Sequence, residues 1–425
     1  MKPLANLTSA AQADFYAGKA FAEQPWVKAP ATTAARDGLG PLYNARSCLA
    51  CHANGGRGAL PENPAENLFS AVLRLSVAGD DLQAGVVPEP HYGSQIQTQS
   101  ISLEHQLGLP AHPNGIAAEA KVFIHWQSHT FTYPDGSSLE LRKPQFELQQ
   151  LAYGALAADT RFSLRNSPPI AGMGLLEAIP EADILANEDP EDKNRDGLSG
   201  RANLVWDQDV QMLRLGRYGL KANMASLEHV VAAAFLNDIG ISNPLFAQQN
   251  CSPVQTACAK APTGNNADGF ELPRNLLKLV TDFTRHLAVM QYRQPPNAQG
   301  HLLFYQLNCQ GCHHPEYVTA DNKGANSRQR IYPYSDLLLH DMGPELADGR
   351  SDFLATGSEW RTAPLWGVGL SEAVNGHRYL LHDGRAANVE QAILWHGGEA
   401  AASRQAFTQL DKHMRAALID FVESL

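Results

Sequence analysis

The chain has 425 residues, and 44% of them are hydrophobic, so it is long enough to bury the cores of two or three domains. The formal net charge of −11 argues against nucleic acid or an anionic membrane as a partner, because both repel an acidic protein. It suits a basic carrier protein or a neutral small substrate. No apolar run approaches twenty residues, so we expect no transmembrane segment.

Two pentapeptides of the same form are the most informative features of the chain. A helical pattern over about 9–23 precedes Cys48-Leu49-Ala50-Cys51-His52, and a second helical pattern over 298–308 precedes Cys309-Gln310-Gly311-Cys312-His313. Cys-x-x-Cys-His is the spacing that attaches a c-type haem, with two thiols bonded to one porphyrin and the histidine bound to its iron. A zinc site that pairs the two motifs is the alternative, but they lie about 260 residues apart, far beyond the spacing of zinc ribbons.

The predicted haem sites therefore involve six residues. Cys48, Cys51, Cys309 and Cys312 would carry the porphyrins, and His52 and His313 would be the proximal ligands.

Residues 85–145 follow the first motif and differ from their helical surroundings. Alternating segments at Val122–Trp126 and Phe131–Tyr133 lead into Asp135-Gly136, a dipeptide typical of hairpin turns. We expect a small β-containing insertion here.

A carboxylate suited to proton transfer follows in the segment Gly172–Pro180. Glu177 lies in this stretch, which is apolar and rich in Gly and Pro, so we expect the stretch to be buried. A buried carboxylate can move a proton during cleavage of a peroxide O–O bond. A helix-capping or salt-bridged Glu is the alternative.

The next segment, Asp189–Gly200, contains the pattern D-x-N-x-D-G. Asp192, Asn194 and Asp196 place oxygen atoms at alternate positions, as in the first half of a calcium-binding EF-hand loop. The twelfth loop position is Asn203 instead of Glu, so the match is incomplete, and a solvated acidic turn is the alternative.

Two cysteines remain outside the motifs. Cys251 and Cys258 share a short loop, which predicts a disulfide and an oxidising compartment, whereas two free buried thiols are the alternative. Because c-type haem is attached outside the bacterial cytoplasm, we expect a periplasmic protein. No secretory signal is visible after Met1, so the chain reads as a form that lacks its signal peptide.

Two helical patterns indicate more helix: one over 227–239 with Ser226 as N-cap, and one that Asn275 is expected to cap. A Gly-, Asn- and Pro-rich stretch over 261–273 predicts a boundary between an N-terminal domain, 1–265, and a C-terminal domain, 266–425. The predicted fold class is mainly α, with two cytochrome c-like haem domains and the β-containing insertion in the first.

The sixth iron position decides what each haem does, because an open position admits peroxide or oxygen. For the second haem the candidates are His396 and Met342, with His340, His377 and His382 less favoured. The closing pattern 408–425 predicts a C-terminal helix. For the first haem no candidate has a motif of its own, which favours an open or replaceable position. These candidates are His91, His105, His112, His125 and His129.

Several segments together resemble the bacterial di-haem cytochrome c peroxidase superfamily, and within it the di-haem oxidoreductase branch, labelled peroxidase or thiol oxidoreductase. They span nearly the whole chain. The segments are Gly38–Asn44, Ser47–Gly58, Pro168–Pro180, Asp189–Asn203, Gly216–Ala222, Glu359–Gly367 and Leu381–Ala400.

This resemblance implies two cytochrome c-like domains, with substrate bound at the N-terminal haem and electrons relayed by the C-terminal haem. It implies that His396 is the second ligand of the C-terminal haem and that Glu177 is the active-site carboxylate. It also implies a calcium ion between the domains, with backbone oxygens from Thr362 and Pro364.

The chain departs from the family pattern at some positions. The displaceable histidine that follows the first motif in the peroxidases has no identifiable counterpart here. Leu220 stands where the branch usually has Trp, so a relay role for that ring is absent. A His instead of a Met on the second haem lowers its potential, which questions ordinary peroxidase cycling.

We therefore expect a di-haem c-type oxidoreductase that reduces hydrogen peroxide at the N-terminal haem. Two covalent haems and calcium are the expected cofactors, and a small donor protein, a cytochrome c or a cupredoxin, is the expected partner. One alternative is an electron-transfer cytochrome without peroxidase activity. Another is an oxidase or oxygenase that acts on an organic or protein substrate through high-valent iron.

Overall fold

The structure is a computed structural model, and it describes residues 1–425 except 34, 103–105, 107–114 and 290–295. The longer helices are α1 (Ser9–Glu23), α4 (Met173–Glu177), α5 (Glu181–Leu185), α6 (Leu227–Ala234), α8 (Arg274–His286), α9 (Ala298–Gln306), α10 (Ser371–Asn375), α11 (Val389–Trp395), α12 (Ala401–Gln409) and α13 (Lys412–Ser424). The shorter helical turns are α2 (Cys48–Cys51), η1 (Ala53–Gly55), η2 (Phe235–Ile239), α7 (Thr256–Ala259), η3 (Cys309–Gly311), η4 (Val368–Leu370) and η5 (Gly398–Ala400).

The strands of the described residues pair as six separate antiparallel sheets of two strands each. These pairs are β1 (Leu42–Tyr43) with β3 (Gln99–Ser100), β2 (Ala71–Ser76) with β6 (Arg161–Asn166), β4 (Lys121–Thr132) with β5 (Ser138–Gln149), β7 (Leu204–Asp207) with β8 (Met212–Leu215), β9 (Tyr317–Val318) with β10 (Arg330–Ile331), and β11 (Leu339–Asp341) with β12 (Glu359–Arg361).

The expected fold class, mainly α with two cytochrome c-like domains, is wrong. The protein is 28% helical and 18% strand, with its strands spread over many small sheets. The hairpin of β4 and β5 accounts for much of the difference, because each strand has 12 residues. Its second strand carries Pro144 opposite Trp126. A proline argues against a strand in sequence analysis, although it is tolerated at an unprotected edge, so the sequence indicated only the first strand and the turn.

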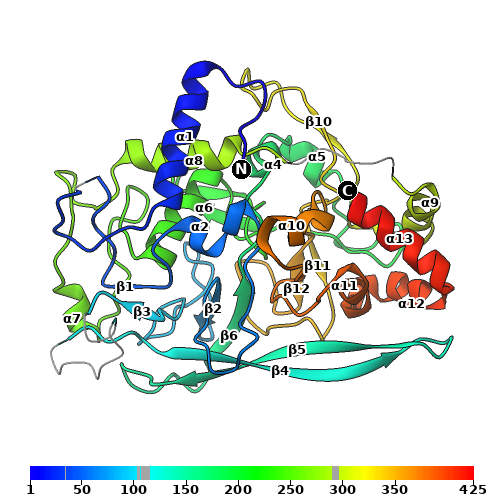
Figure 1. Cartoon of the computed structure of the whole chain (residues 1–425), viewed down its shortest axis with the longest axis horizontal. Helices are drawn as coiled ribbons and strands as arrows, with labels where there is room; N and C mark the ends of the chain where they lie inside the picture. The colour runs from blue at the N-terminus through cyan, green and yellow to red at the C-terminus, as the bar shows by residue number, and fades with distance from the viewer. Residues whose placement is uncertain (34, 103–105, 107–114, 290–295) are drawn as a thin grey trace.

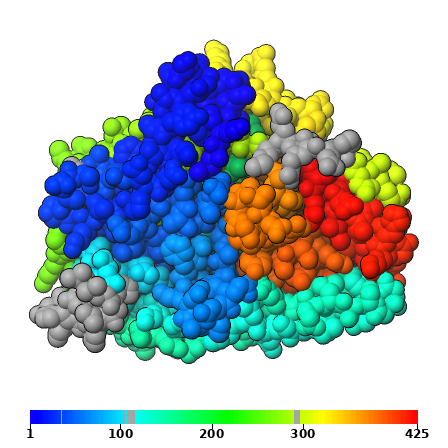
Figure 2. Space-filling model, in the orientation of Figure 1, coloured from blue at the N-terminus to red at the C-terminus, as the bar shows by residue number. Residues whose placement is uncertain are grey.

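The β4–β5 hairpin extends along one edge of the molecule and supports the C-terminal helices (Figure 1; Figure 2). The hydroxyl of Tyr133 donates to Glu390 at 2.8 Å, and Gln391 Nε2 donates to the Glu140 carbonyl at 2.9 Å. Arg415 of α13 pairs with Asp135 in the hairpin turn at 2.7 Å. A segment from the first half of the chain therefore holds α11 and α13 in place.

Each Cys-x-x-Cys-His motif follows a helix that crosses a second helix at a glycine. A Cβ atom on Gly18 of α1 would lie 1.9 Å from the Leu279 carbonyl oxygen of α8. In the same way, a Cβ on Gly300 of α9 would lie 1.9 Å from the Ala417 carbonyl oxygen of α13. Only glycine permits so close an approach of two backbones. The two helix crossings are therefore built alike.

Helix α8 lies beyond the predicted domain boundary at 265 but packs against α1. Phe15 of α1 and Phe283 of α8 belong to one buried cluster, with ring centroids 5.2 Å apart. A separate buried cluster surrounds Phe304 of α9 and Phe421 of α13. The division into 1–265 and 266–425 stays a prediction.

The helix boundaries agree with the sequence patterns in part. The Ser226 hydroxyl accepts a hydrogen bond from His229 N at the start of α6, which confirms the predicted N-cap. Helix α8 begins at Arg274 after Pro273, so Asn275 is inside the helix and is not its cap. The C-terminal helix predicted over 408–425 is α13, which begins at Lys412 because Asp411 caps it, after α12 has ended at Gln409. None of the helices in the described ranges has the length and apolar character needed to cross a membrane.

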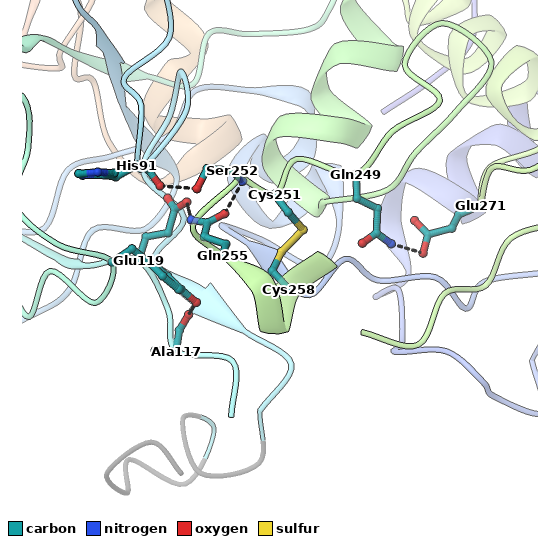
Figure 3. The surroundings of a disulfide bond; sticks show 10 residues. His91, Ala117, Glu119, Gln249, Cys251, Ser252, Gln255, Cys258 and Glu271 are labelled. Atoms are coloured by element: carbon teal, nitrogen blue, oxygen red, sulfur yellow. Dashed lines mark hydrogen bonds between the residues drawn. A yellow bond between two sulfur atoms is a disulfide. The ribbon is translucent and has the colours of Figure 1, made fainter. Parts of the chain in front are cut away.

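A disulfide joins Cys251 and Cys258 (Figure 3). The loop that it closes contacts the segment around Glu119. Gln255 Nε2 donates to Glu119 Oε1 at 2.5 Å, and the Ser252 hydroxyl donates to the His91 carbonyl at 2.6 Å. The disulfide therefore fixes a surface loop onto the segment that precedes the hairpin.

Candidate haem sites

The first motif forms a single helical turn. Helix α2 spans the two cysteines, and His52 N donates to the Cys48 carbonyl at 3.0 Å. The His52 ring is oriented from outside the motif, because its Nδ1–H donates to the Pro168 carbonyl oxygen at 2.7 Å. A carbonyl can only accept, so Nδ1 carries the proton and Nε2 keeps the lone pair that a metal requires.

The second motif repeats this arrangement after α9. Asn308 adopts the left-handed conformation (φ 58°) that ends the helix, and Cys309–Gly311 forms the turn η3. The His313 Nδ1–H donates to the Tyr334 carbonyl oxygen at 2.9 Å. The histidines of both motifs are therefore held in the same tautomer by a backbone carbonyl from a distant loop.

Burial keeps these imidazoles neutral, as iron ligation requires. It lowers the pKa of His52, and it lowers the pKa of His313 to about 4. The residues of both motifs thus fit haem: each offers two unbonded thiols and one neutral imidazole with Nε2 available.

The thiols of the two motifs do not have the properties of reactive cysteines. Burial raises the pKa of Cys48, Cys51 and Cys309 to about 12, so these thiols stay protonated. A reactive thiol has a lowered pKa. In the part of the chain that the structure describes, no group of three or more His, Cys, Asp and Glu could hold a metal ion, so the alternative of a zinc site receives no support.

His396, at the end of α11, faces His313. Their ring centroids are 6.5 Å apart with an angle of 41° between the planes. Two imidazoles bound on opposite sides of one metal, with bonds of about 2 Å, place their centroids about 6 Å apart. The His396 Nδ1–H donates to the Ala392 carbonyl at 2.7 Å, so its Nε2 is also available, and burial lowers its pKa.

Met342, the other candidate, lies beside the same segment. Its carbonyl oxygen would lie 2.8 Å from a Cβ on Gly397, and its side chain packs on the C-terminal core. The ring spacing of His313 and His396 favours His396 as the second ligand, although neither assignment is tested and both stay predictions.

Among the described residues, no second imidazole ring faces His52 in this way. Of the candidate histidines, His91 donates from Nδ1 to the Ala155 carbonyl and His125 contacts Glu147, both at exposed positions. His129 lies on the β4–β5 hairpin against Trp395. His105 and His112 lie outside the described residues.

Glu177 occupies the end of α4, and its carboxylate has two partners. Arg285 Nε donates to Oε2 at 2.7 Å, and Leu227 N, at the start of α6, donates to Oε1 at 3.2 Å. The carboxylate therefore caps one helix and ties two others together, which is the structural role considered above. Its role in proton transfer stays a prediction.

In the acidic loop predicted to bind calcium, several side-chain oxygens accept hydrogen bonds from backbone N–H groups of the same loop. Asp192 Oδ1 accepts from Gly197 N at 3.2 Å, Asn194 Oδ1 accepts from Asp196 N, and Asp196 Oδ1 accepts from Leu198 N. Calcium in this loop stays a prediction.

The second predicted calcium position involves backbone oxygens directly after β12. The Thr362 carbonyl already accepts from the Ser335 hydroxyl at 2.7 Å and from Arg361 Nη1 at 3.0 Å. Pro364 lies two residues further along at a half-buried position. Calcium at Thr362 and Pro364 likewise stays a prediction.

A buried charged group lies beside the second motif, and no sequence pattern predicts it. His340 Nδ1 contacts Glu399 and its Nε2 contacts Asp336, each at 2.7 Å, and the Cys312 sulfur lies 3.5 Å from Nδ1. Bonds to two carboxylates raise the pKa of His340, so it is an imidazolium and cannot ligate iron. Glu399 also accepts from Ser199 N and Oγ. Spacing could not reveal this group, because its members come from three distant segments.

Two motifs of this form, each with an oriented neutral histidine, define a protein that carries two haems. The chain matches the family model "Di-haem oxidoreductase, putative peroxidase" over residues 1–425, and it belongs to this family of di-haem oxidoreductases. No curated protein matches it. One solved structure, a hydrazine synthase of Kuenenia stuttgartiensis pressurised with 20 bar xenon, matches at a TM-score of 0.31 and 14% identity, over 62% of this chain and 73% of that chain. A similarity this low carries no conclusion.

Proposed function

We propose that this chain is a periplasmic c-type di-haem enzyme that reduces hydrogen peroxide at the His52 haem with electrons relayed by the His313 haem. The observation that carries this proposal is the difference between the two sites. His313 has a second imidazole at the spacing expected for a shared metal, whereas no described histidine ring faces His52 at that spacing. A six-coordinate site suits electron transfer, and a five-coordinate site suits substrate binding.

When bound, haem iron supplies the redox chemistry and a position where peroxide can coordinate. The protein supplies orientation. The Pro168 and Tyr334 carbonyls hold the Nδ1 protons of His52 and His313, which directs each Nε2 away from the carbonyl and strengthens the imidazole as a ligand.

Cleavage of a peroxide O–O bond also needs a group that moves a proton from the near oxygen to the far oxygen. Glu177 is our candidate for this group. Its bond with Arg285 fixes the carboxylate on α4, and the Leu227 amide holds the other oxygen. To take a proton, one carboxylate oxygen would exchange such a partner for the substrate.

Electrons would reach the second haem from a small donor protein, a cytochrome c or a cupredoxin. The net charge of −11 favours a donor with a basic surface, because opposite charges accelerate encounter. The Cys251–Cys258 disulfide is consistent with an oxidising compartment such as the periplasm.

The resting absorption and electron spin resonance spectra test this proposal on protein made in a host that matures c-type cytochromes. We expect one low-spin haem and one high-spin haem, and only the high-spin signal should change when peroxide is added. Two low-spin haems that do not react with peroxide would contradict the proposal and favour an electron-transfer cytochrome. A high-spin haem that ignores peroxide but is reduced by an organic or protein substrate would favour an oxidase or oxygenase.

A further inference from the structure

The His340 group, which consists of Asp336, His340 and Glu399, has no part in the function proposed above. The Nε2 atom of His340 lies 2.7 Å from Asp336 and its Nδ1 lies 2.7 Å from Glu399, so both nitrogens must donate. The side chains of His340 and Asp336 are at most 3% exposed, and that of Glu399 is 10% exposed. Buried charges are unfavourable unless they bond to one another, so these hydrogen bonds fix the geometry of the group.

One side of the His340 group is bonded to the second motif. Asp336 N donates at 2.9 Å to the carbonyl of Cys312, the residue directly before His313. Two residues before Asp336, the Tyr334 carbonyl accepts from His313 Nδ1 at 2.9 Å. The segment that carries Asp336 therefore contacts both the backbone beside His313 and its ring.

The other side of the group is bonded to the segment that carries His396. Glu399 lies three residues after His396, and its Oε1 accepts from Asp341 N at 2.9 Å. Between them, Gly397 and Gly398 pack on the end of β11, and a Cβ on Gly398 would lie 2.2 Å from the Asp341 carbonyl oxygen. Glycine permits this close contact but adds no stiffness to the chain. The position of His396 therefore depends on α11 before it and on Glu399 after it.

This arrangement requires a carboxylate at position 399. Glu399 Oε2 accepts from His340 Nδ1 at 2.7 Å and from Ser199 N at 2.8 Å. Its Oε1 accepts from Ser199 Oγ and from Asp341 N, each at 2.9 Å. Each oxygen thus faces a backbone N–H, which can only donate. An amide in place of the carboxylate would set its own N–H group against one of these donors.

We propose that the His340 group positions His396, so that this ring stays bound to the iron of the His313 haem. The inference rests on the proposed function, which makes His396 the second ligand of that haem. The group joins the backbone beside one ligand to the segment that carries the other ligand. It therefore fixes the separation of the two rings, whose centroids are 6.5 Å apart.

The positioning of His396 bears on where peroxide binds. A six-coordinate haem offers no position for peroxide, whereas a five-coordinate haem does. By keeping His396 in place, the His340 group leaves the His52 haem as the site of peroxide binding. Removal of one member of a buried charged group leaves its partners uncompensated, which is strongly unfavourable. The segment after α11 would then move, and the second haem would become open to small ligands.

The test compares His340→Gln and Glu399→Gln with the wild type, all as holoprotein, by spin resonance of the ferric form and by carbon monoxide titration of the reduced form. We expect the equilibrium constant for binding of His396 to fall by roughly tenfold or more, a size typical of coupling within one ion-pair network. A high-spin signal from the second haem should appear. The variants should bind carbon monoxide at both haems, whereas the wild type should bind it at the His52 haem alone.

Two controls separate positioning from a general loss of stability. His301→Gln is the matched variant, because His301 lies on α9 before the second motif and its ring packs on Tyr305 and Phe421. It should keep the wild-type spin state even where it lowers the unfolding temperature. The second control adds His340→Gln to His396→Ala. Because His340 acts through His396, the double variant should match the spin state and carbon monoxide binding of His396→Ala alone.

Three results would overturn the inference. Both Gln variants, folded and with two attached haems, could keep a low-spin His313 haem that does not bind carbon monoxide. His301→Gln could produce the same change as His340→Gln. The double variant could differ from His396→Ala in its spin state. If His340→Gln fails to fold, Glu399→Gln decides, because it leaves His340 paired with Asp336 and keeps the buried charges balanced.

Failure of the proposed function gives a different result. A wild-type protein without a low-spin haem, or without attached haem by mass spectrometry, would refute the proposed function and this inference with it.

Discussion

The imidazole rings of His313 and His396 face each other with their centroids 6.5 Å apart, and each ring is oriented by a hydrogen bond from Nδ1 to a backbone carbonyl. One ring follows a Cys-x-x-Cys motif and the other ends α11, so the fold brings together two imidazole rings from residues 83 positions apart. The second site differs from the first in this respect, because no described histidine ring faces His52 at this spacing.

Replacing His396 tests the second ligand. We expect His396→Ala to convert the His313 haem from low-spin to high-spin, and His396→Met to raise its midpoint potential, because a thioether favours reduced iron. Redox titration with spin resonance detection measures both effects. The control is His413→Ala at an exposed position on α13. A low-spin His313 haem with unchanged potential in His396→Ala would assign the sixth position to another residue, with Met342 the next to test.

Replacing Glu177 tests proton transfer. We expect Glu177→Gln to slow peroxide turnover by roughly tenfold or more, because Gln cannot accept a proton. Glu181→Gln is the matched control, since Glu181 is a nearby carboxylate that pairs with Arg214 at 2.8 Å in an exposed position. Steady-state rates and thermal unfolding are measured on both variants. Equal turnover in the wild type and in a stable Glu177→Gln would leave Glu177 with its structural role alone.

The pH dependence of stability tests the buried carboxyl of Glu119 near the disulfide loop (Figure 3). Burial raises its pKa from 4.5 to about 8. Between these values the folded protein keeps a proton that the unfolded chain has released, so stability falls as the pH rises. Each tenfold change in proton affinity corresponds to about 1.4 kcal/mol.

We therefore expect Glu119→Gln to unfold at a temperature that falls less across this pH window than in the wild type. Differential scanning calorimetry at a series of pH values measures the slope. Glu66→Gln, at an exposed position, is the control. Identical slopes for wild type and Glu119→Gln would show that the carboxyl is ionised in the folded protein.

The helix crossings predict a large effect of one methyl group. Gly300→Ala would place a Cβ 1.9 Å from the Ala417 carbonyl oxygen and 2.6 Å from the Phe421 Cβ, so the two helices must separate. We expect a loss of about 1–3 kcal/mol in the free energy of unfolding. Gly324→Ala is the control, because its closest contact is the flexible Asn322 side chain at 3.3 Å. Denaturant unfolding that does not distinguish the two variants would contradict close packing at this crossing.

The sequence predicted the parts of the molecule that depend on local spacing. The two Cys-x-x-Cys-His motifs, helix α1 and the Ser226 cap each follow from residues within one turn or one helix. The hairpin turn at Asp135-Gly136 also follows from a dipeptide. These features need no knowledge of distant contacts.

Features that depend on distant segments were missed or underestimated. The second hairpin strand is stabilised by pairing with the first and by contacts with α11, which its own pattern, interrupted by Pro144, does not reveal. The His340 group beside Cys312 joins three segments and has no motif. The family resemblance predicts a mainly α fold. The small sheets form only when strands pair in the folded chain, so local patterns do not predict them.

The proposed function requires porphyrin bonded to this chain at Cys48 and Cys51 and again at Cys309 and Cys312. Intact mass spectrometry under denaturing conditions, on protein from a host with the cytochrome c maturation system, tests it most directly. We predict the mass of the polypeptide plus two haems, reduced to one haem by Cys→Ser changes in either motif. The mass of the bare polypeptide, without a Soret band, would contradict the account.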